Sequence, residues 1–414
     1  MSDTRRAGFK NRTRLQAARE RLLDAVDPVE RTERVPAATA VGRTLATDVT
    51  AVRAVPHYDR AAMDGYAVQA ADTFDATARS PAVLRESETV GTGEAAQVHT
   101  GSELPEGADA VVMVERTERV GDEIEVGTAV AEGENVAPAG EDVAEGETVL
   151  PAGRRIRPSD PGFCKVVGAR QIEVVERPTV GVVPTGEELV ERDPGPGEVV
   201  ESNGLTVSQF VERWGGQPTY RNVVTDDRQS LRVAVERDLT KDIVVTTGGT
   251  SVGERDLLAD VLADLGEVDV HGVAIKPGHP VGFAVVRETP VLMLPGYPVS
   301  CLVTAVALLR PAIKRALGTD PEPHPATRAT LTEKLPSEVG VRTFARVTLS
   351  GDGTSEDRTG TDEPDLPTVT PLRTSGAGVM SSVARADGWV VVPESREGIP
   401  AGETVAVEHW EYQP

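Results

Sequence analysis

The second half of the chain alternates apolar runs with helical patterns, and this alternation restricts the fold more than any other feature. Apolar residues are nearly continuous in the runs 180–183, 243–247 and 291–294, and a further strand is expected at 220–224. Apolar positions recur at helical spacing in the segments 205–214, 227–239, 257–265 and 299–317. Continuous apolar strands separated by helices are typical of a mostly parallel sheet covered on both faces. We therefore predict a doubly wound α/β domain.

The segments on either side of this part have a different pattern of apolar and turn-forming residues. From about residue 35 to 176, short β-rich runs are separated by Gly, Pro, Asp and Asn. A helix is expected at 13–26, where Pro28 stops it. After the stiff linker 321–325 the chain is β-rich again, and we expect strands at 344–349, 379–383, 389–392 and 404–407. These patterns predict a multidomain protein of the α/β plus β class.

A chain of 414 residues exceeds what one hydrophobic core usually serves, so several domains are expected. A helix and linking domain would comprise residues 1–53 with 141–177. The other predicted domains are a β-rich domain at 54–140, the α/β domain at 178–320 and a C-terminal β domain at 326–414.

Charge and cysteine content exclude several classes of function. The formal net charge is −23, and only six of the 43 basic residues are lysine. No basic patch offsets this charge, which argues against nucleic acid as a partner. Two distant cysteines predict neither a disulfide framework nor a zinc site. The polar start and the short apolar runs predict a cytoplasmic protein without a membrane span. A salt-adapted, halophilic cytoplasm is expected, with ordinary acidity for solubility as the alternative.

The glycine-rich segment 246–256, Thr-Thr-Gly-Gly-Thr-Ser-Val-Gly-Glu-Arg-Asp, carries the strongest chemical signal. It follows an apolar strand and begins a helix. Glycines at 248, 249 and 253 allow backbone N–H groups to approach an anion, and the start of a helix favours negative charge. Its spacing matches neither the dinucleotide fingerprint nor the P-loop. The alternative is a structural turn, but the hydroxyls and Asp256 favour a phosphate site.

Acidic residues follow several of the predicted strands. The loops 184–189, 225–228, 246–256 and 294–300 are expected at one edge of the sheet, because parallel strands all end there. They gather Glu187 or Glu188, Asp226 or Asp227, and Asp256. Carboxylates beside a phosphate repel it unless a hard cation lies between them, and Mg²⁺ suits that arrangement. Helix capping is the alternative for each of these acids taken singly.

Lys276 lies in the segment Ala-Ile-Lys-Pro-Gly and is one of only six lysines in an arginine-rich chain. A site that needs a compact charge against an oxyanion or phosphate would explain it, and a solvated turn lysine is the alternative. In the N-terminal half, Asp64-Gly65 and Thr100-Gly101 are turn signals. A simple hairpin would account for the first of them.

Taken in order, these motifs resemble the molybdopterin molybdenumtransferase family, which includes bacterial MoeA proteins and the E domain of gephyrin. The matching blocks start at about residue 13 and continue to the end of the chain. They are Ala-Ala-Met-Asp-Gly-Tyr-Ala at 61–67, Thr-Gly at 100–101, Leu-Pro-Glu-Gly-Ala-Asp at 104–109, Gly-Glu-Asp at 140–142, Thr-Gly-Glu-Glu-Leu at 185–189, the segment 247–256, Ile-Lys-Pro-Gly at 275–278 and Leu-Pro-Gly-Tyr-Pro-Val-Ser at 294–300.

The resemblance implies a homodimer of elongated subunits, with an α/β domain of the molybdopterin-binding type and a C-terminal β-barrel-like domain. The implied reaction inserts molybdate or tungstate into adenylylated molybdopterin, with Mg²⁺, and releases AMP. Other cofactor-biosynthesis proteins would be further partners. A halophilic archaeal source is expected from the resemblance together with the acidic composition.

By motif position, the resemblance also assigns site residues. The implied catalytic residues are Asp64, Thr100, Asp142 and Lys276. The implied metal ligands are Glu188, Asp226 and Asp256. The implied substrate-binding residues are Thr185, Gly186, Gly248, Gly249, Ser251, Gly253, Pro295, Pro298 and Arg346, of which the last would lie near the molybdate.

The chain departs from the family pattern at a few positions. Tyr297 stands where Asn is frequent, Glu187 replaces a frequent Asp, and Ala377 occupies a place where Ser is common. Molybdopterin adenylyltransferases resemble only the α/β part, and so do the competence-related nucleotide hydrolases. Neither explains the block around Asp64. A binding or scaffold protein without catalysis is the alternative from a different class, and the retained acidic residues argue against it.

Overall fold

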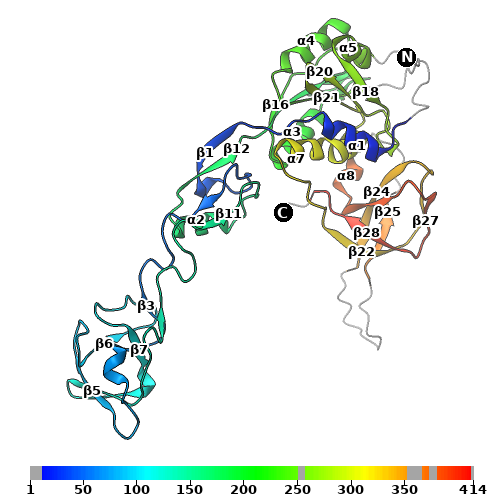
Figure 1. Cartoon of the computed structure of the whole chain (residues 1–414). Helices are drawn as coiled ribbons and strands as arrows, with labels where there is room; N and C mark the ends of the chain where they lie inside the picture. The colour runs from blue at the N-terminus through cyan, green and yellow to red at the C-terminus, as the bar shows by residue number, and fades with distance from the viewer. Residues whose placement is uncertain (1–11, 250–256, 352–365, 373–379, 412–414) are drawn as a thin grey trace. The chain divides into compact units, whose positions relative to one another are not determined.

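The computed structural model describes residues 12–249, 257–351, 366–372 and 380–411 (Figure 1). The chain forms two compact units. One extends from Thr32 to Val175, and the other combines the residues up to Arg31 with those from Glu176 onward. None of the described helices is both long and apolar enough to cross a membrane.

A six-stranded sheet forms the α/β part of the second unit, and its strand order is β16-β13-β17-β21-β20-β18. Strands β16 (Gln217–Tyr220), β13 (Thr179–Pro184), β17 (Ile243–Thr247) and β21 (Thr289–Leu294) are parallel. Strands β20 (Gly282–Val286) and β18 (Glu267–His271) complete the sheet through antiparallel pairing. Every residue of β17 and β21 is buried, which explains why their sequences are mostly apolar and carry no charge. The predicted, mostly parallel sheet is confirmed.

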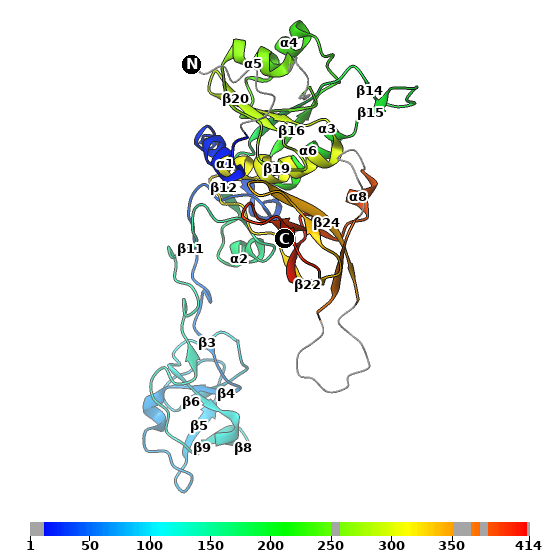
Figure 2. The same cartoon turned by 90° about the vertical axis from the view of Figure 1, so that its right-hand side faces the viewer.

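Helices cover both faces of this sheet (Figure 2). On one face, α4 (Arg228–Asp238) and α5 (Leu257–Leu265) bury Leu231, Val235 and Leu262 against strand residues. On the other, α3 (Asn203–Arg213) packs against β13 and against α6 (Pro298–Thr304). The strand expected at 220–224 is misplaced: β16 covers Gln217–Tyr220, and only Tyr220 belongs to both ranges. The doubly wound arrangement is confirmed.

The helix predicted at 299–317 is interrupted by one π-helical turn. It consists of α6, the π-helical segment Ala305–Leu309 and α7 (Arg310–Ala316). Pro311 has no N–H, so the helix lacks one donor at this position. Ala307, four residues earlier, would accept that bond in a regular α-helix, and its carbonyl accepts from Arg19 Nε at 3.1 Å. Arg19 belongs to α1 (Leu15–Asp24), which packs on α7.

The C-terminal part is a closed barrel of five strands. These are β22 (Ala326–Leu331), β24 (Arg342–Ser350), β25 (Thr368–Pro371), β26 (Gly388–Val392) and β28 (Thr404–Glu408). The strand order β24-β25-β22-β28-β26 closes because β26 also pairs with β24. The barrel-like fold is therefore confirmed. The strand expected at 379–383 is wrong, because Ser381–Ala384 form the short helix α8.

The first unit contains a β-rich sheet with the strand order β7-β4-β6-β5-β9-β8. Its central strand β4 (Gly65–Val68) pairs with β6 (Glu94–Val98) and β7 (Ala110–Met113). A Cβ on Gly65 would lie 1.9 Å from the Val112 carbonyl oxygen, so only glycine fits. Gly65 therefore begins a central strand and is not part of a hairpin turn.

The remaining strands of that sheet are β5 (Ala82–Glu86), β8 (Thr117–Val120) and β9 (Glu123–Val126). A separate hydrophobic core surrounds α2 (Asp160–Val166) and the ribbon of β1 (Thr32–Pro36) with β12 (Gln171–Val175). The structure groups α1 with the α/β part, whereas the sequence interpretation attached it to residues 141–177. The division into four domains stays a prediction.

Candidate functional site

Backbone hydrogen bonds join the carboxyl ends of the parallel strands. Thr185 N–H donates to the Thr247 carbonyl at 3.2 Å, and Gly248 N–H donates to the Leu294 carbonyl at 3.0 Å. Gly186 N–H donates to the Val224 carbonyl at 3.1 Å. Four of the predicted loops therefore begin at one edge of the sheet. This is the edge at which α/β proteins bind their ligands.

The first glycines of segment 246–256 are required by the local geometry. Gly248 has φ +116° and Gly249 has φ +71°, in the region that favours glycine. A Cβ on Gly248 would lie 2.2 Å from the Thr185 carbonyl oxygen, and one on Gly249 would lie 2.8 Å from Thr185 Oγ1. The two adjacent loops thus approach each other backbone to backbone. Ser251, Gly253 and Asp256 lie outside the described residues.

Two buried hydroxyl groups lie at this strand edge. Thr185 and Thr247 are each 1% exposed. Within the described ranges, neither Oγ1 has a hydrogen-bond partner. A buried polar group without a partner costs free energy, so these hydroxyls indicate a place for a polar ligand. The sequence interpretation included Thr185 but missed Thr247. A hydroxyl residue at the end of a fully apolar strand is the signal that identifies it.

The structure separates the two aspartates of loop 225–228. Asp227 Oδ1 accepts from Ser230 N–H at 2.9 Å and caps α4, while Oδ2 accepts from the Thr225 hydroxyl at 2.7 Å. These bonds, with Ser230 first, lower the pKa of Asp227 to about 2. Asp226 is half-buried, and its Oδ1 atom is buried. Asp227 therefore has a structural role as the cap of α4.

Glu188 and Glu187 are both exposed. The Glu188 carboxylate lies close to Gly186. A Cβ on that glycine would be 2.8 Å from Glu188 Oε2. Gly186 is also the residue bonded to Val224, two residues before Asp226. No cluster of three potential metal ligands occurs among the described residues. The third predicted ligand, Asp256, lies outside those residues.

The loop 294–300 follows β21 at the same edge. Pro295 is buried, and Pro298 is the first residue of α6. Asn203, at the start of α3, donates from Nδ2 to the Gly296 carbonyl at 2.7 Å. The sequence interpretation missed Asn203, because a single polar residue just before the helix expected at 205–214 is ordinarily explained as a helix cap.

The two predicted cationic residues lie on neighbouring strands of the C-terminal sheet. Lys276 lies on β19 (Ile275–Lys276), which pairs with β24. It is 57% exposed, and its Nζ lies 3.6 Å from Glu338 Oε1. Arg346, on β24, is half-buried, and its Nε has no hydrogen-bond partner within the described ranges. Burial lowers the pKa of Arg346.

The remaining predicted residues lie in the first unit. Asp64 Oδ1 accepts from Thr100 N–H at 2.6 Å and from the Thr100 hydroxyl at 3.0 Å. These bonds lower the pKa of Asp64, the backbone bond contributing most. The structure thus brings together two residues that are 36 positions apart. Asp142 is exposed in the same unit, and its N–H donates to the Val55 carbonyl at 3.0 Å.

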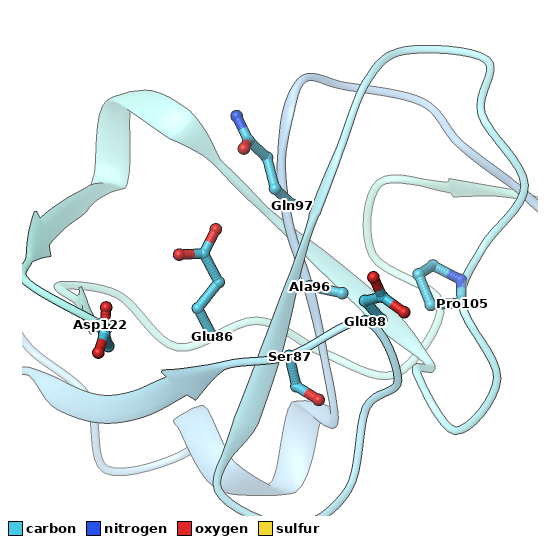
Figure 3. Close-up of a pocket in the computed structure, with 7 residues that line it drawn as sticks. All are labelled: Glu86, Ser87, Glu88, Ala96, Gln97, Pro105 and Asp122. Carbon is cyan, nitrogen blue, oxygen red and sulfur yellow. The ribbon is translucent and has the colours of Figure 1, made fainter.

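The first unit also has an open cavity of about 570 Å³ (Figure 3). Its lining includes Glu86, Glu88 and Asp122, and it contains none of the predicted site residues. Arg119 already pairs with Glu86. This acidic hollow therefore gives no argument for a ligand.

The described residues define a multidomain protein whose parallel sheet ends in glycine backbone, two buried hydroxyls and two acidic side chains. Such an edge suits a ligand that carries phosphate and binds together with a divalent cation. Three family models match successive parts of this chain. "MoeA N-terminal region (domain I and II)" matches residues 13–168, "Probable molybdopterin binding domain" matches 181–315, and "MoeA C-terminal region (domain IV)" matches 328–410.

Relatives of similar length agree with these matches. Molybdopterin molybdenumtransferase 2 of Mycobacterium tuberculosis is 32% identical over 398 residues, 90% of this chain and 94% of the relative. The molybdopterin molybdenumtransferase of Bacillus subtilis is 29% identical over 394 residues, 91% and 89% of the two chains. A crystal structure of the molybdopterin biosynthesis MoeA protein from Pyrococcus horikoshii has a TM-score of 0.82 and 34% identity, and covers 97% of this chain and 100% of that one. The chain therefore belongs to the MoeA family of molybdopterin molybdenumtransferases.

Proposed function

We propose that this protein transfers molybdenum from molybdate, or tungsten from tungstate, to adenylylated molybdopterin and releases AMP. Relatives with which it aligns over most of their length are named molybdopterin molybdenumtransferases. The oxyanion and the adenylylated molybdopterin are both substrates. Water cleaves the phosphoanhydride bond of the latter, and the products are AMP and the metal-loaded cofactor.

The buried hydroxyls of Thr185 and Thr247 are the observation that carries this proposal. Each has no partner among the described residues, and both belong to the strand edge at which the Gly248 backbone comes closest to its neighbour. Phosphate oxygens accept hydrogen bonds from such donors and from glycine N–H groups. The two hydroxyls would therefore hold a phosphate of the substrate and fix its distance from the sheet.

Glu188 and Asp226 fit a magnesium ion at the same edge. Mg²⁺ is usually bound by one or two carboxylates together with substrate phosphates and water. The loops that carry these two acids are joined by the bond between Gly186 and Val224, and one oxygen of Asp226 is already buried. When bound, the cation would offset the charge that develops as the phosphoanhydride breaks. Asp256 would be the third ligand.

Lys276 and Arg346 would attract the metal oxyanion. Glu338 lies beside Lys276 and partly neutralises its ammonium group. Both side chains of that pair are exposed, so solvent screens the pair and an incoming oxyanion can replace Glu338 at little cost. Arg346 carries a fixed charge with a buried, unpartnered Nε atom among the described residues, which is the arrangement that favours an anion.

Asp64, Thr100 and Asp142 would act on the substrate from the β-rich unit of a second subunit in a homodimer. Thr100 holds Asp64 ionised, because both of its hydrogen bonds go to the same carboxylate oxygen. The other oxygen of Asp64 is then available to orient a water molecule or a substrate hydroxyl. The family's implied dimer motivates this assignment.

The test is to incubate the purified protein with adenylylated molybdopterin, Mg²⁺ and either molybdate or tungstate. AMP and metal-loaded cofactor should appear in equal amounts. In a second incubation with ATP and molybdopterin, formation of adenylylated molybdopterin would show an adenylyltransferase instead. Tight binding of adenylylated molybdopterin without turnover would show a binding protein.

The double variant Thr185→Val with Thr247→Val removes both hydroxyls at nearly constant volume. We expect weaker binding of adenylylated molybdopterin with an unchanged fold, as measured by calorimetry and circular dichroism. Thr246→Val is the matched control, because this buried hydroxyl lies on the same strand and already faces the Leu292 carbonyl at 3.5 Å. Equal affinity of the double variant and the control would contradict the proposed phosphate contact.

A further inference from the structure

The turn Pro-Gly-Tyr-Pro at 295–298 is held at several points. Asn203 Nδ2 donates to the Gly296 carbonyl at 2.7 Å, and the Leu294 carbonyl accepts from Gly248 N–H at 3.0 Å. The Tyr297 carbonyl accepts from Cys301 N–H at 2.9 Å, which joins the turn to α6. Two prolines further restrict its backbone. The turn is therefore a fixed support for the side chain of Tyr297.

This turn lies beside the proposed phosphate cradle, which is formed by the Thr185 and Thr247 hydroxyls and the Gly248 backbone. Gly248 N–H bonds the Leu294 carbonyl just before the turn, and a Cβ added to Gly296 would lie 3.4 Å from the Cα atom of Gly248, so little more than a methyl group would fit between the two loops. Tyr297 is the next residue along the chain. Its backbone is thus one residue away from the point at which the turn comes close to the cradle.

The Tyr297 side chain is 65% exposed. It stands at the N-cap of α6 but makes no side-chain cap hydrogen bond, so the helix does not explain its presence. Leu205 and Tyr220 are also exposed, on segments next to the same start of α3: Leu205 follows Asn203 by two residues, and the Tyr220 ring packs on Gly204. Exposed apolar groups gathered on rigid supports are typical of binding surfaces.

We propose that Tyr297 stacks on a planar nitrogen heterocycle of the substrate whose phosphate lies in the cradle beside Gly248. This inference rests on the proposed function, since that function supplies a ligand with phosphate between two ring systems, an adenine and a pterin. Either ring has a π face, and aromatic side chains stack on such faces without reading the ring's hydrogen-bond pattern. Tyr297 would thus set the affinity for the ring-bearing part of the ligand.

The test compares three probes by isothermal titration calorimetry in the presence of Mg²⁺: AMP, metal-free molybdopterin and ribose 5-phosphate, which has no ring system of this kind. Tyr297→Ala should raise the Kd of one ring-bearing probe about tenfold, from the usual strength of base–aromatic stacking. The Kd of ribose 5-phosphate should not change. Tyr297→Phe should retain the affinity of the native protein, because it keeps the ring.

The pattern of loss identifies the ring. A change confined to AMP assigns Tyr297 to adenine, and a change confined to metal-free molybdopterin assigns it to the pterin. Val233→Ala is the control, since Val233 is similarly exposed on the helix α4. If Tyr297→Ala binds AMP and metal-free molybdopterin as the native protein does, the stacking contact is overturned and the proposed function stands. If the native protein binds none of the probes, the proposed function itself is overturned, and the contact with it.

Discussion

At the residue scale, two neighbouring aspartates differ in their hydrogen bonds. Asp226 and Asp227 are adjacent, yet only Asp227 caps a helix. Its pKa of about 2 lies below the ordinary aspartate value. A depressed pKa in the folded state contributes stability above the unfolded-state pKa, and this stability is lost as the pH falls towards 2.

This difference predicts a pH effect. Between about pH 4 and pH 2, the thermal stability of the native protein should fall more steeply than that of Asp227→Asn, which cannot ionise and keeps a capping oxygen. Differential scanning calorimetry at a series of pH values measures the effect. Asp226→Asn should instead reduce the release of AMP. Parallel pH profiles for native protein and Asp227→Asn would contradict the capping role.

A second prediction concerns Gly248. In Gly248→Ala, the new methyl group would meet the Thr185 carbonyl oxygen at 2.2 Å in a backbone conformation that disfavours alanine. We expect a loss of more than about 1 kcal/mol in the free energy of unfolding, together with weaker binding of adenylylated molybdopterin. Gly318→Ala is the control, since Gly318 also has a positive φ but nothing lies near its Cβ position. Denaturant melts of the two variants should differ by the clash alone.

At the scale of elements, apolar periodicity made the α/β sheet predictable, because β17 and β21 are buried along their whole length and carry no charged residue. Periodicity does not specify which side chains meet across segments. The bond from Asn203 to Gly296 and the burial of the Thr247 hydroxyl depend on long-range packing, so the sequence interpretation missed both. The prediction of a strand at 379–383 was wrong, because its two valines were given more weight than the serines that begin α8.

The hydrogen bond between Arg19 and Ala307 joins two elements, since it attaches α1 to the π-helical segment before α7. Arg19→Ala should cost about 1–3 kcal/mol in the free energy of unfolding, since the Ala307 carbonyl loses its charged donor beside Pro311. Arg21→Ala is the control on the same helix. The Arg21 side chain is exposed, and its pair with Asp269 spans 3.6 Å, so its loss should change stability by less than about 0.5 kcal/mol. Equal midpoints in urea would contradict the role of Arg19.

At the scale of the whole molecule, the net charge of −23 makes the folded protein repel itself. Salt screens this repulsion, so the Tm should rise as KCl is increased into the molar range. Sucrose at equal osmolality is the control, because it changes the solvent without screening charge. A Tm that responds equally to both solutes would contradict the electrostatic explanation and, with it, the expected salt-adapted source.

The attachment of α1 also affects the order in which the protein is assembled during synthesis. The donor Arg19 and its acceptor Ala307 are separated by 288 positions. At ordinary rates of translation, about 15–60 s pass between their synthesis. The complete unit Thr32–Val175 leaves the ribosome in this interval, and it has its own hydrophobic cores. Helix α1 can therefore dock only after most of the chain has been made, which makes its docking a late step of folding.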